Sequence, residues 1–334
     1  MAFNLNKILV FTGAIALIIV VVFFAWWWTD EVIINNEPDV AEINFKKSSI
    51  SGVQCEDADR RPMAVMVSSD SETRPLSGLS QADIVFEMPV TPAGVTRMMA
   101  VYQCSTPGEI GSIRSARGDF IPLAAGLGAV YVHWGGEREA LKKLDSHIID
   151  NIDAMVYEGK YFYRKSGVKQ PHNGFADFST LLKASDDLKY KKENSFAGYP
   201  HGQNKQPSNI LNLVDSFSID YPFPFDVKWV YDKGSNTFKR SRGGIPEIDR
   251  NNNSQIEARA VVVMKTTSSF TNKDYLSVQV AGEGDLSVYQ NGMKISGRWK
   301  KDTPLDSKLF FYDTDGKEIE FVPGKIWVEI VTSD

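Results

Sequence analysis

The feature that most constrains this chain is an uncharged, mostly apolar run of 21 residues from Ile8 to Trp28. As a helix the run would be about 31 Å long, close to the hydrocarbon thickness of about 30 Å in a bilayer. Three consecutive tryptophans end the run, as is typical of a membrane–water interface. A cleaved signal peptide has a shorter apolar core and a small-residue cleavage site. The run therefore predicts an uncleaved transmembrane anchor.

The charges around the apolar run predict its orientation. Lys7 and the amino terminus precede the run, and the nearest basic residues after it are Lys46 and Lys47. Because basic residues stay on the cytoplasmic side, we expect a single-pass membrane protein with a cytoplasmic N-terminus and extracytoplasmic C-terminal domains. Cys55 and Cys104 would then lie in an oxidising compartment, where they either form a disulfide or remain two unrelated buried thiols.

Composition shifts divide the chain into four regions. Residues 1–28 are a cytoplasmic stub and the transmembrane anchor, and the polar residues 29–59 predict a spacer. Residues 60–200 alternate strand-like and helix-like segments, which predicts an α/β N-terminal domain with a mixed sheet. Residues 201–334 predict a smaller, mostly β C-terminal domain. A stretch rich in glycine and proline near residues 196–215 predicts a linker between the two domains.

The expected elements follow apolar periodicity and turn signals. Strands are expected at 63–67, 83–90, 95–103 and 129–133, and helices at 119–127, 137–144 and 177–191. The C-terminal strands are expected at 227–231, 258–265, 275–280, 286–290, 293–299, 308–312 and 326–331. Asn291-Gly292 and Asp315-Gly316 lie between apolar runs and predict hairpin turns.

The densest polar cluster, around Arg114 and Arg117, lies between a predicted strand and a predicted helix. The two arginines are three residues apart, so on a helical turn they would share a face. A helix start offers free N–H groups, and Ser115 can cap it. Such an arrangement suits a phosphate or carboxylate ligand. The alternative is that the arginines pair with nearby acids such as Asp83 or Glu87.

A second polar motif follows the expected strand 129–133. His133 ends that strand, and Gly135 and Gly136 lead into the next helix. In α/β folds ligands bind outside the carboxyl ends of strands, and paired glycines let a ligand approach the backbone closely. The alternative is a histidine whose hydrogen bonds are satisfied within the fold.

A third motif combines basic and aromatic residues. Arg164 belongs to an aromatic run, and His172 and Asn173 follow a proline. Arg97 adds another arginine near a strand edge. Aromatic rings beside basic groups suit sugar stacking or anion contact, although they are also common in packed cores.

Several functional classes lack their sequence signals. There is no Walker loop, nucleophile elbow, zincin motif or dinucleotide fingerprint. A net charge of −5 disfavours nucleic-acid binding. Four scattered histidines and two cysteines give no metal-ligand spacing. We therefore predict no cofactor and no metal site; the catalytic residues, if any, stay unknown, and whether the chain is an enzyme stays open.

Taken together, the motifs resemble the YerB-like family of bacterial lipoproteins, defined by domain of unknown function 3048, over about residues 60–334. The resemblance rests on ordered matches at 61–67, 74–87, 96–97, 110–117, 133–136, 171–173, 311–317 and 327–329. It implies two domains, an extracytoplasmic location and no established reaction. It also suggests that motif positions are occupied by Arg97, Arg114, Arg117, His133, Arg164 and His172. Family members are often anchored through a lipidated cysteine, which the transmembrane helix replaces here.

These observations predict a membrane-anchored cell-envelope protein that binds an anionic envelope ligand in an arginine/histidine cleft. The candidate ligands are a glycan phosphate, a lipid-linked sugar phosphate or peptidoglycan carboxylates. The expected ligand-binding residues are Arg97, Arg114, Ser115, Arg117, His133, Gly135, Gly136, Arg164, His172 and Asn173. One alternative is an envelope glycan or phosphate transferase or hydrolase on the same site. Another is an interaction scaffold for an envelope protein partner.

Overall fold

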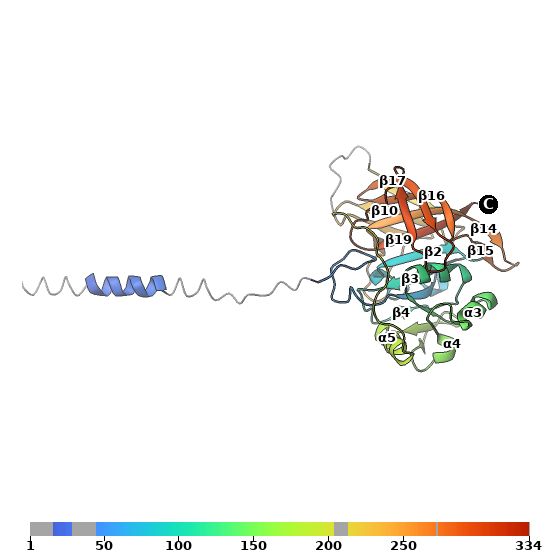
Figure 1. Ribbon diagram of the computed structural model, residues 1–334, viewed down its shortest axis with the longest axis horizontal. Coiled ribbons are helices and arrows are strands. Elements are labelled where there is room, and N and C mark those ends of the chain that lie inside the picture. Colours follow the sequence, from blue (N-terminus) through green and yellow to red (C-terminus); the bar gives the residue numbers. More distant parts are fainter. Residues whose placement is uncertain (1–15, 29–44, 204–212, 272, 334) are drawn as a thin grey trace, which may run out of the picture. The chain divides into compact units, whose positions relative to one another are not determined.

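The computed structural model describes residues 16–28, 45–203, 213–271 and 273–333, which belong to two units, Met1–Asn44 and Phe45–Asp334 (Figure 1). In the first unit, residues 16–28 are helical and their side chains are exposed. The rest of the predicted anchor lies outside the described residues. Across these four described ranges, no helix is both long and apolar enough to cross a membrane.

The second unit, here called the body, is built on an eleven-stranded mixed sheet. The strands follow the order β18-β17-β16-β14-β19-β2-β3-β1-β5-β6, and β15 pairs with β14. Because β2 pairs in parallel with β19, strands from both predicted domains share one sheet. The strands are β1 Met63–Ser68, β2 Ile84–Pro89, β3 Thr96–Tyr102, β5 Val130–His133, β6 Asn151–Asp153, β14 Ala260–Phe270, β15 Leu276–Val278, β16 Gly282–Gln290, β17 Met293–Lys301, β18 Leu309–Asp313 and β19 Ile326–Ser333.

Two smaller sheets complete the body. One has five strands and includes β9 Ser216–Ile219, β10 Val227–Asp232, β11 Thr237–Arg242, β12 Ile245–Pro246 and β13 Glu257–Ala258. The other has three strands, β4 Ile110–Gly111, β7 Tyr163–Arg164 and β8 Gly174–Ala176.

The helices are short, which corrects the expected α/β class of the N-terminal domain. They are α2 Ile121–Gly126, α3 Arg138–Asp145, α4 Ala154–Tyr157 and α5 Phe178–Asp187, with 3-10 turns η1 Ser71–Thr73, η2 Leu79–Gln81 and η3 Gly118–Phe120. The fold is a two-domain, mostly β fold with a mixed sheet. The physical reason is that the five-stranded sheet, rather than a layer of crossover helices, covers much of one sheet face.

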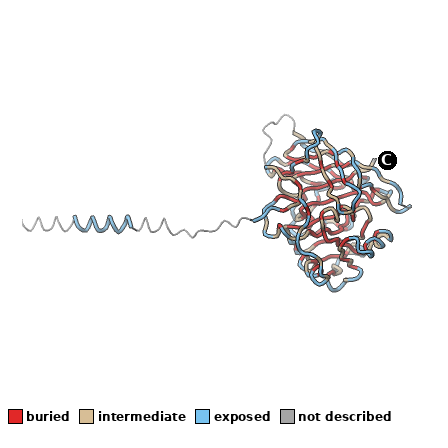
Figure 2. The backbone as a smooth tube through the Cα atoms, in the orientation of Figure 1, coloured by how far each residue is buried: buried red, intermediate tan, exposed pale blue. Residues whose placement is uncertain are grey.

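Alternation along the strands buries both faces of the mixed sheet. Along β1, Ala64 and Met66 join one apolar cluster, which includes Phe120 beside α2. Their neighbour Val65 joins the other cluster, with Trp229 of the five-stranded sheet. Figure 2 shows that buried residues run along the strands of the body. The continuous apolar run of 63–67 is therefore a strand buried on both sides, as predicted.

The hairpin at Asn291-Gly292 is confirmed. Both residues have positive φ, 53° and 66°, and they connect the antiparallel strands β16 and β17. This is the backbone that a two-residue type I′ turn requires, and asparagine and glycine adopt it more readily than other residues.

The strand directions define two edges of the mixed sheet. The strands β1, β2, β5, β6, β14 and β19 all run parallel to one another, since β3 is antiparallel to both β1 and β2. Their carboxyl ends therefore lie along one edge, here called the carboxyl edge. The opposite edge, the amino edge, receives the first described residues of the body. There, Ser51 Oγ donates to Asp83 Oδ1 at 2.6 Å, and the Gly324 N–H donates to the Ser51 carbonyl at 2.8 Å.

The structure also pairs Cys55 with Cys104 in a disulfide, with Cα atoms 5.8 Å apart. Cys104 follows β3, and its backbone N–H donates to Asp83 at 3.1 Å. The disulfide therefore ties the residues that enter the body to the amino edge of the mixed sheet.

Candidate functional site

The segment that carries Arg114 lies at the carboxyl edge, between two strand ends. The Arg114 N–H donates to the Met66 carbonyl of β1 at 2.9 Å. The Trp134 N–H donates to the Arg114 carbonyl at 3.0 Å, and the Ala116 N–H donates to the Gly135 carbonyl at 2.9 Å. Two motifs that the sequence separates by about twenty residues are thus joined through their backbones.

This backbone is extended, so the expected helical turn with Arg114 and Arg117 on one face is wrong. The next 3-10 turn, η3, begins after Arg117, whose φ and ψ are −131° and 141°. The hydrogen bonds to β1 and to the end of β5 hold the segment extended. In the alternative, the arginines pair with nearby acids such as Asp83 or Glu87. The structure gives these two acids other partners, because Asp83 binds Ser51 and Glu87 binds arginines of β11, and the acid that Arg114 faces is Asp70.

The structure brings a group of charged side chains together, here called the arginine cluster: Asp70, Arg97, Arg114, Arg117 and His172. The Asp70 carboxylate, just after β1, lies at its centre. Asp70 Oδ2 is 3.8 Å from Arg97 Nη1, 3.6 Å from Arg114 Nη2 and 3.8 Å from His172 Nδ1. These distances are those of loose ion pairs and are too long for hydrogen bonds.

Register explains why Arg97 reaches this place. Arg97 lies opposite Ser68 in the antiparallel pairing of β3 with β1, and Asp70 comes two residues after Ser68. The third sequence motif, which includes His172, contacts Arg114. Arg114 Nη1 donates to the Pro171 carbonyl at 3.0 Å and lies 3.4 Å from His172 Nδ1. Residues far apart in the sequence therefore meet at one place.

Several guanidinium N–H groups of the cluster are buried without an acceptor. Arg97 is only 4% exposed, and its Nε and Nη1 have no hydrogen-bond partner among the described residues. The same holds for Nε of Arg114 and of Arg117. A buried donor left unsatisfied costs about 1–3 kcal/mol, and native proteins satisfy the great majority of such groups. The Asp70 carboxylate therefore does not satisfy all the buried donors of the cluster.

The electrostatics of the cluster favour an additional negative charge. Burial raises the pKa of Asp70, but Arg97, the Ser68 hydroxyl and Arg114 outweigh it and hold that pKa below its usual value, so Asp70 is ionised near neutral pH. Burial, followed by Arg114, lowers the pKa of Arg97 to about 9, so the guanidinium stays charged. Burial and Arg114 also lower the pKa of His172, which favours the neutral imidazole. Two guanidinium groups therefore face one carboxylate, and the charge of Arg117 adds to theirs by further lowering the pKa values of Arg97 and Arg114.

Arg117 lies on the side of the cluster toward β15. Its Nη1 donates to the Ala116 carbonyl at 2.9 Å, and its guanidinium lies 4.8 Å from the ring centre of Tyr275. Ser115 is partly buried in the same extended segment, between the two arginines.

His133 does not belong to the cluster. It is 1% exposed, and both ring nitrogens have partners: Nδ1 lies 2.8 Å from the Gly135 carbonyl, and Nε2 lies 3.2 Å from Asn151 Oδ1. Gly135 itself has a φ of +60°, and its N–H donates to Asp153 Oδ1 at 2.8 Å. These residues fix the end of β5, which matches the structural alternative weighed for this histidine.

Arg164 and Asn173 support the loop that carries His172. Arg164 lies 4.0 Å over the Trp134 ring, donates through Nη1 to Asn173 Oδ1 at 3.0 Å, and pairs through Nε with Glu158 Oε1 at 2.8 Å. Its charge is therefore neutralised beside the cluster. Gly136 forms a bridge with Ala116 and holds the extended segment in place.

Sequence reasoning missed Asp70. A usable signal was present, because Asp70 lies two residues after the end of a buried strand, at the same edge as the other motifs. Within the part of the chain that is described, no group of three potential metal ligands comes together.

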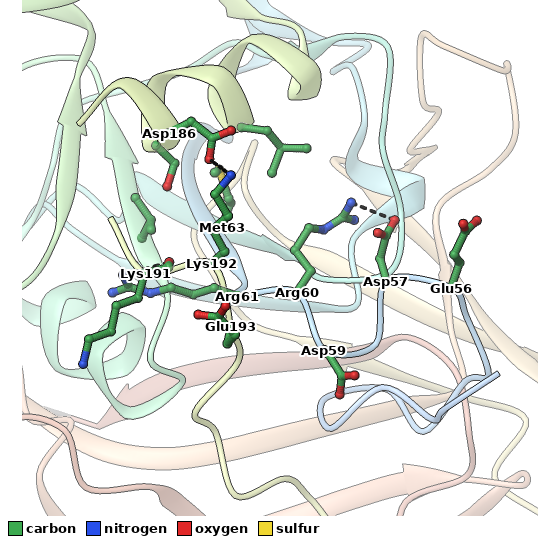
Figure 3. A pocket seen from close by; sticks show the side chains of 13 residues that line it. Glu56, Asp57, Asp59, Arg60, Arg61, Met63, Asp186, Lys191, Lys192 and Glu193 are labelled. Carbon is green, nitrogen blue, oxygen red and sulfur yellow. Dashed lines mark hydrogen bonds and ion pairs between the residues drawn. The ribbon is translucent and has the colours of Figure 1, made fainter. Parts of the chain in front are cut away.

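A pocket of about 400 Å³ opens elsewhere in the body (Figure 3). Its lining includes Arg60, Asp57, Asp186 and Lys192 and shares no residue with the arginine cluster. Arg60 pairs with Asp57 at 2.8 Å and Lys192 with Asp186 at 2.8 Å, as the dashed lines show. Five acidic and four basic residues line the pocket, so it offers no excess positive charge to select an anion.

Comparisons by family model, by sequence and by structure all lead to the same group of proteins. Residues 50–191 match the family described as "Protein of unknown function (DUF3048) N-terminal domain", and residues 218–328 match the corresponding C-terminal domain. The chain is 29% identical over 296 residues to "Putative lipoprotein YerB" of Bacillus subtilis (strain 168), covering 85% of this chain and 86% of that protein. The crystal structure of YerB protein from Bacillus subtilis superposes with a TM-score of 0.78 at 28% identity, over 86% of this chain and 97% of that one.

Proposed function

Because the chain belongs to the DUF3048 family, whose two domains it contains in order, we propose that it is a membrane-tethered, extracytoplasmic protein that binds an anionic group at the arginine cluster. One observation carries this proposal. Arg97 is buried, charged and left with two guanidinium nitrogens that no described acceptor satisfies. A phosphate or carboxylate group supplies oxygen acceptors and negative charge at once.

The position of the cluster supports ligand entry. It lies at the carboxyl edge, where α/β proteins with parallel strands commonly bind their ligands. The side chains of Arg114 and His172 are 17% and 16% exposed, whereas that of Arg97 is 5% exposed. A ligand would therefore pass Arg114 and His172 and meet Arg97 at the floor.

The proposal divides the sequence-predicted residues into two groups. Arg97, Arg114 and Arg117 contact the anion, with His172 at the entrance. The remaining residues hold these side chains in place: Ser115, His133, Gly135, Gly136, Arg164 and Asn173.

Two observations support the proposed location. The Cys55–Cys104 disulfide suits an oxidising compartment. The relative from Bacillus subtilis is named a putative lipoprotein, and we propose that residues 8–28 replace the lipid as a transmembrane anchor. The ligand is then a component of the cell envelope.

Titration of the full-length chain, held in an amphipol, tests anion binding. Isothermal titration calorimetry with inorganic phosphate and with acetate is compared between the wild type and Arg114→Gln. We expect the variant to bind phosphate at least about ten-fold more weakly, because it loses one charge-assisted contact. The matched control is Arg298→Gln, an exposed arginine of β17 that pairs with Glu283.

The control variant should bind like the wild type. Equal phosphate affinity in the wild type and Arg114→Gln, or no binding of either anion by the wild type, overturns the proposal. The melting temperature of each variant confirms that it is folded.

A further inference from the structure

Large apolar side chains are exposed around the arginine cluster. Among the described residues of the body, five such side chains are at least 60% exposed: Met155, Val156, Phe223, Ile245 and Phe270. They form three groups, which come from α4, from the five-stranded sheet with its β9–β10 loop, and from the end of β14, and each group borders the cluster. We call these five residues the apolar rim.

The first group of the rim follows β6. Met155 and Val156 belong to α4, which begins directly after β6 ends at the carboxyl edge. Met155 Cγ lies 3.2 Å from the place that a Cβ on Gly135 would occupy. Since the Gly135 carbonyl accepts the Ala116 N–H, this group adjoins the segment of Arg114 and Arg117.

The second group comes from the five-stranded sheet. The side chain of Pro222, next to Phe223, packs against Gly94 in the turn between β2 and β3. The Pro224 carbonyl accepts Arg74 Nη2 at 3.0 Å, and the same nitrogen donates to the Ser69 carbonyl at 2.9 Å. Ser69 directly precedes Asp70 of the cluster.

Ile245 belongs to the same group. It lies opposite Arg242 in the pairing of β12 with β11. The intervening Gly243 lies near both Arg74 and the Pro224 carbonyl. Ile245 is thus held beside the loop that carries Phe223.

The third group is the carboxyl end of β14. Phe270 lies opposite Leu276 of β15. The neighbouring Tyr275 is the ring over which Arg117 lies. The hairpin of β14 and β15, labelled in Figure 1, therefore borders the cluster at Arg117.

Resting on the proposed function, we propose that the anion at the arginine cluster is the phosphate head of an amphiphile, and that the hydrocarbon of this lipid phosphate contacts the apolar rim. Grouped, exposed apolar side chains mark surfaces that bind apolar partners. Basic residues combined with exposed apolar residues are the pattern that binds anionic lipids at membrane interfaces. A free sugar phosphate has no apolar part with which to cover the rim.

Three soluble probes test this inference on the full-length chain in an amphipol. They are dihexanoyl phosphatidic acid below its critical micelle concentration, glycerol 3-phosphate, and dihexanoyl phosphatidylcholine. The first probe has both the phosphate head and the chains, the second has the phosphate alone, and the third has the chains without net charge. Protein-free amphipol corrects for partition of the probes.

We expect dihexanoyl phosphatidic acid to bind at least about ten-fold more tightly than glycerol 3-phosphate, because burial of its chains adds affinity. Phe223→Ser combined with Phe270→Ser should reduce this advantage to about two-fold or less, with glycerol 3-phosphate affinity unchanged. The matched control is Val53→Ser combined with Met293→Ser, two exposed apolar residues outside the rim. This control should retain the advantage.

The outcomes separate the two proposals. The amphiphile inference is overturned if dihexanoyl phosphatidic acid and glycerol 3-phosphate bind with equal affinity. It is also overturned if dihexanoyl phosphatidylcholine binds as tightly as dihexanoyl phosphatidic acid. In both cases the comparison of wild type with Arg114→Gln still decides whether the cluster binds anions. If neither phosphate binds, the proposed function fails and this inference fails with it.

Discussion

Glu87 of β2 and Glu329 of β19 lie directly opposite each other on neighbouring parallel strands, and both are fully buried. Arg240 of β11 contacts both carboxylates, with Nη2 at 2.5 Å from Glu87 Oε2 and 3.3 Å from Glu329 Oε1. Arg242 also binds Glu87, at 2.6 Å. These contacts join the five-stranded sheet to the mixed sheet.

The pKa values of the two glutamates are shifted in opposite directions. Burial raises the pKa of Glu87, but Arg242 and Arg240 outweigh it and hold that pKa below its usual value. Burial raises the pKa of Glu329, and its weaker contacts do not offset this effect. Glu87 is therefore the ionised partner of the arginines, and Glu329 is held toward the protonated form.

This difference predicts unequal effects of the same substitution. Glu87→Gln should lower the free energy of unfolding by about 3–5 kcal/mol, because it removes one of the two counter-charges that the buried Arg240 and Arg242 share and leaves them Glu247. Glu329→Gln should change it by less than about 1 kcal/mol, because an amide resembles the protonated acid. Urea unfolding followed by circular dichroism measures both. Equal losses in the two variants would contradict the assignment.

The buried carboxyl of Asp119 predicts a pH dependence of stability. Burial raises its pKa to about 6, with Val278 N–H donation opposing and Glu137 adding to the effect. Because the folded state then holds its proton more tightly than the unfolded state, Asp119 destabilises the fold as pH rises from about 4 to about 6.

Asp119→Asn should remove about 3 kcal/mol of this pH dependence, which a series of urea unfolding curves between pH 4 and pH 7 would show. The exposed Asp285→Asn serves as the control and should follow the wild type. An unchanged slope in Asp119→Asn would count against the raised pKa.

The disulfide predicts a stability contribution that depends on the redox state. Cys55 and Cys104 close a loop with a sequence separation of 49 residues. Closing this loop restricts the unfolded chain and so adds about 4 kcal/mol to the free energy of unfolding. Cys55→Ser combined with Cys104→Ser should lower the free energy of unfolding by about this amount and make it independent of added reductant. If the wild type is equally stable with and without reductant, the bond does not contribute.

His133 should act on stability and not on anion affinity. His133→Ala removes two buried polar contacts and leaves a cavity, so we expect a loss of about 2–4 kcal/mol in the free energy of unfolding. The phosphate affinity of the folded protein, measured by calorimetry well below the melting temperature, should stay within about two-fold of wild type. A large loss of phosphate affinity in a folded His133→Ala variant would show that His133 contributes to anion binding.

Asp70 should compete with the bound anion. Its carboxylate faces Arg97 and Arg114 through loose ion pairs, so it repels a phosphate held by the same arginines. Asp70→Asn should therefore increase phosphate affinity by about ten-fold at low salt. Weaker binding in Asp70→Asn would instead show that the carboxylate positions the arginines.

The sequence predicts the local elements well. The strand 63–67, the helix 137–144 and the hairpin at Asn291-Gly292 follow from apolar periodicity and turn chemistry, which depend on residues close together in the chain. It also locates polar motifs at strand ends. These signals are local, so they can be recognised in the sequence without knowledge of the tertiary fold.

Long-range pairing decided the rest. The parallel pairing of β19 with β2 places Glu329 beside Glu87, and no local pattern marks two strands more than two hundred residues apart as neighbours. Long-range contacts also explain why His133 and Arg97 differ in their hydrogen bonding. Both are basic residues near strand ends, but tertiary contacts give His133 its hydrogen-bond partners and leave buried nitrogens of Arg97 without acceptors. The sequence thus determined which polar motifs stand near strand ends. Only the tertiary structure decided which of their side chains meet at the carboxyl edge and which of them keep buried N–H groups without an acceptor, because long-range strand pairing sets both.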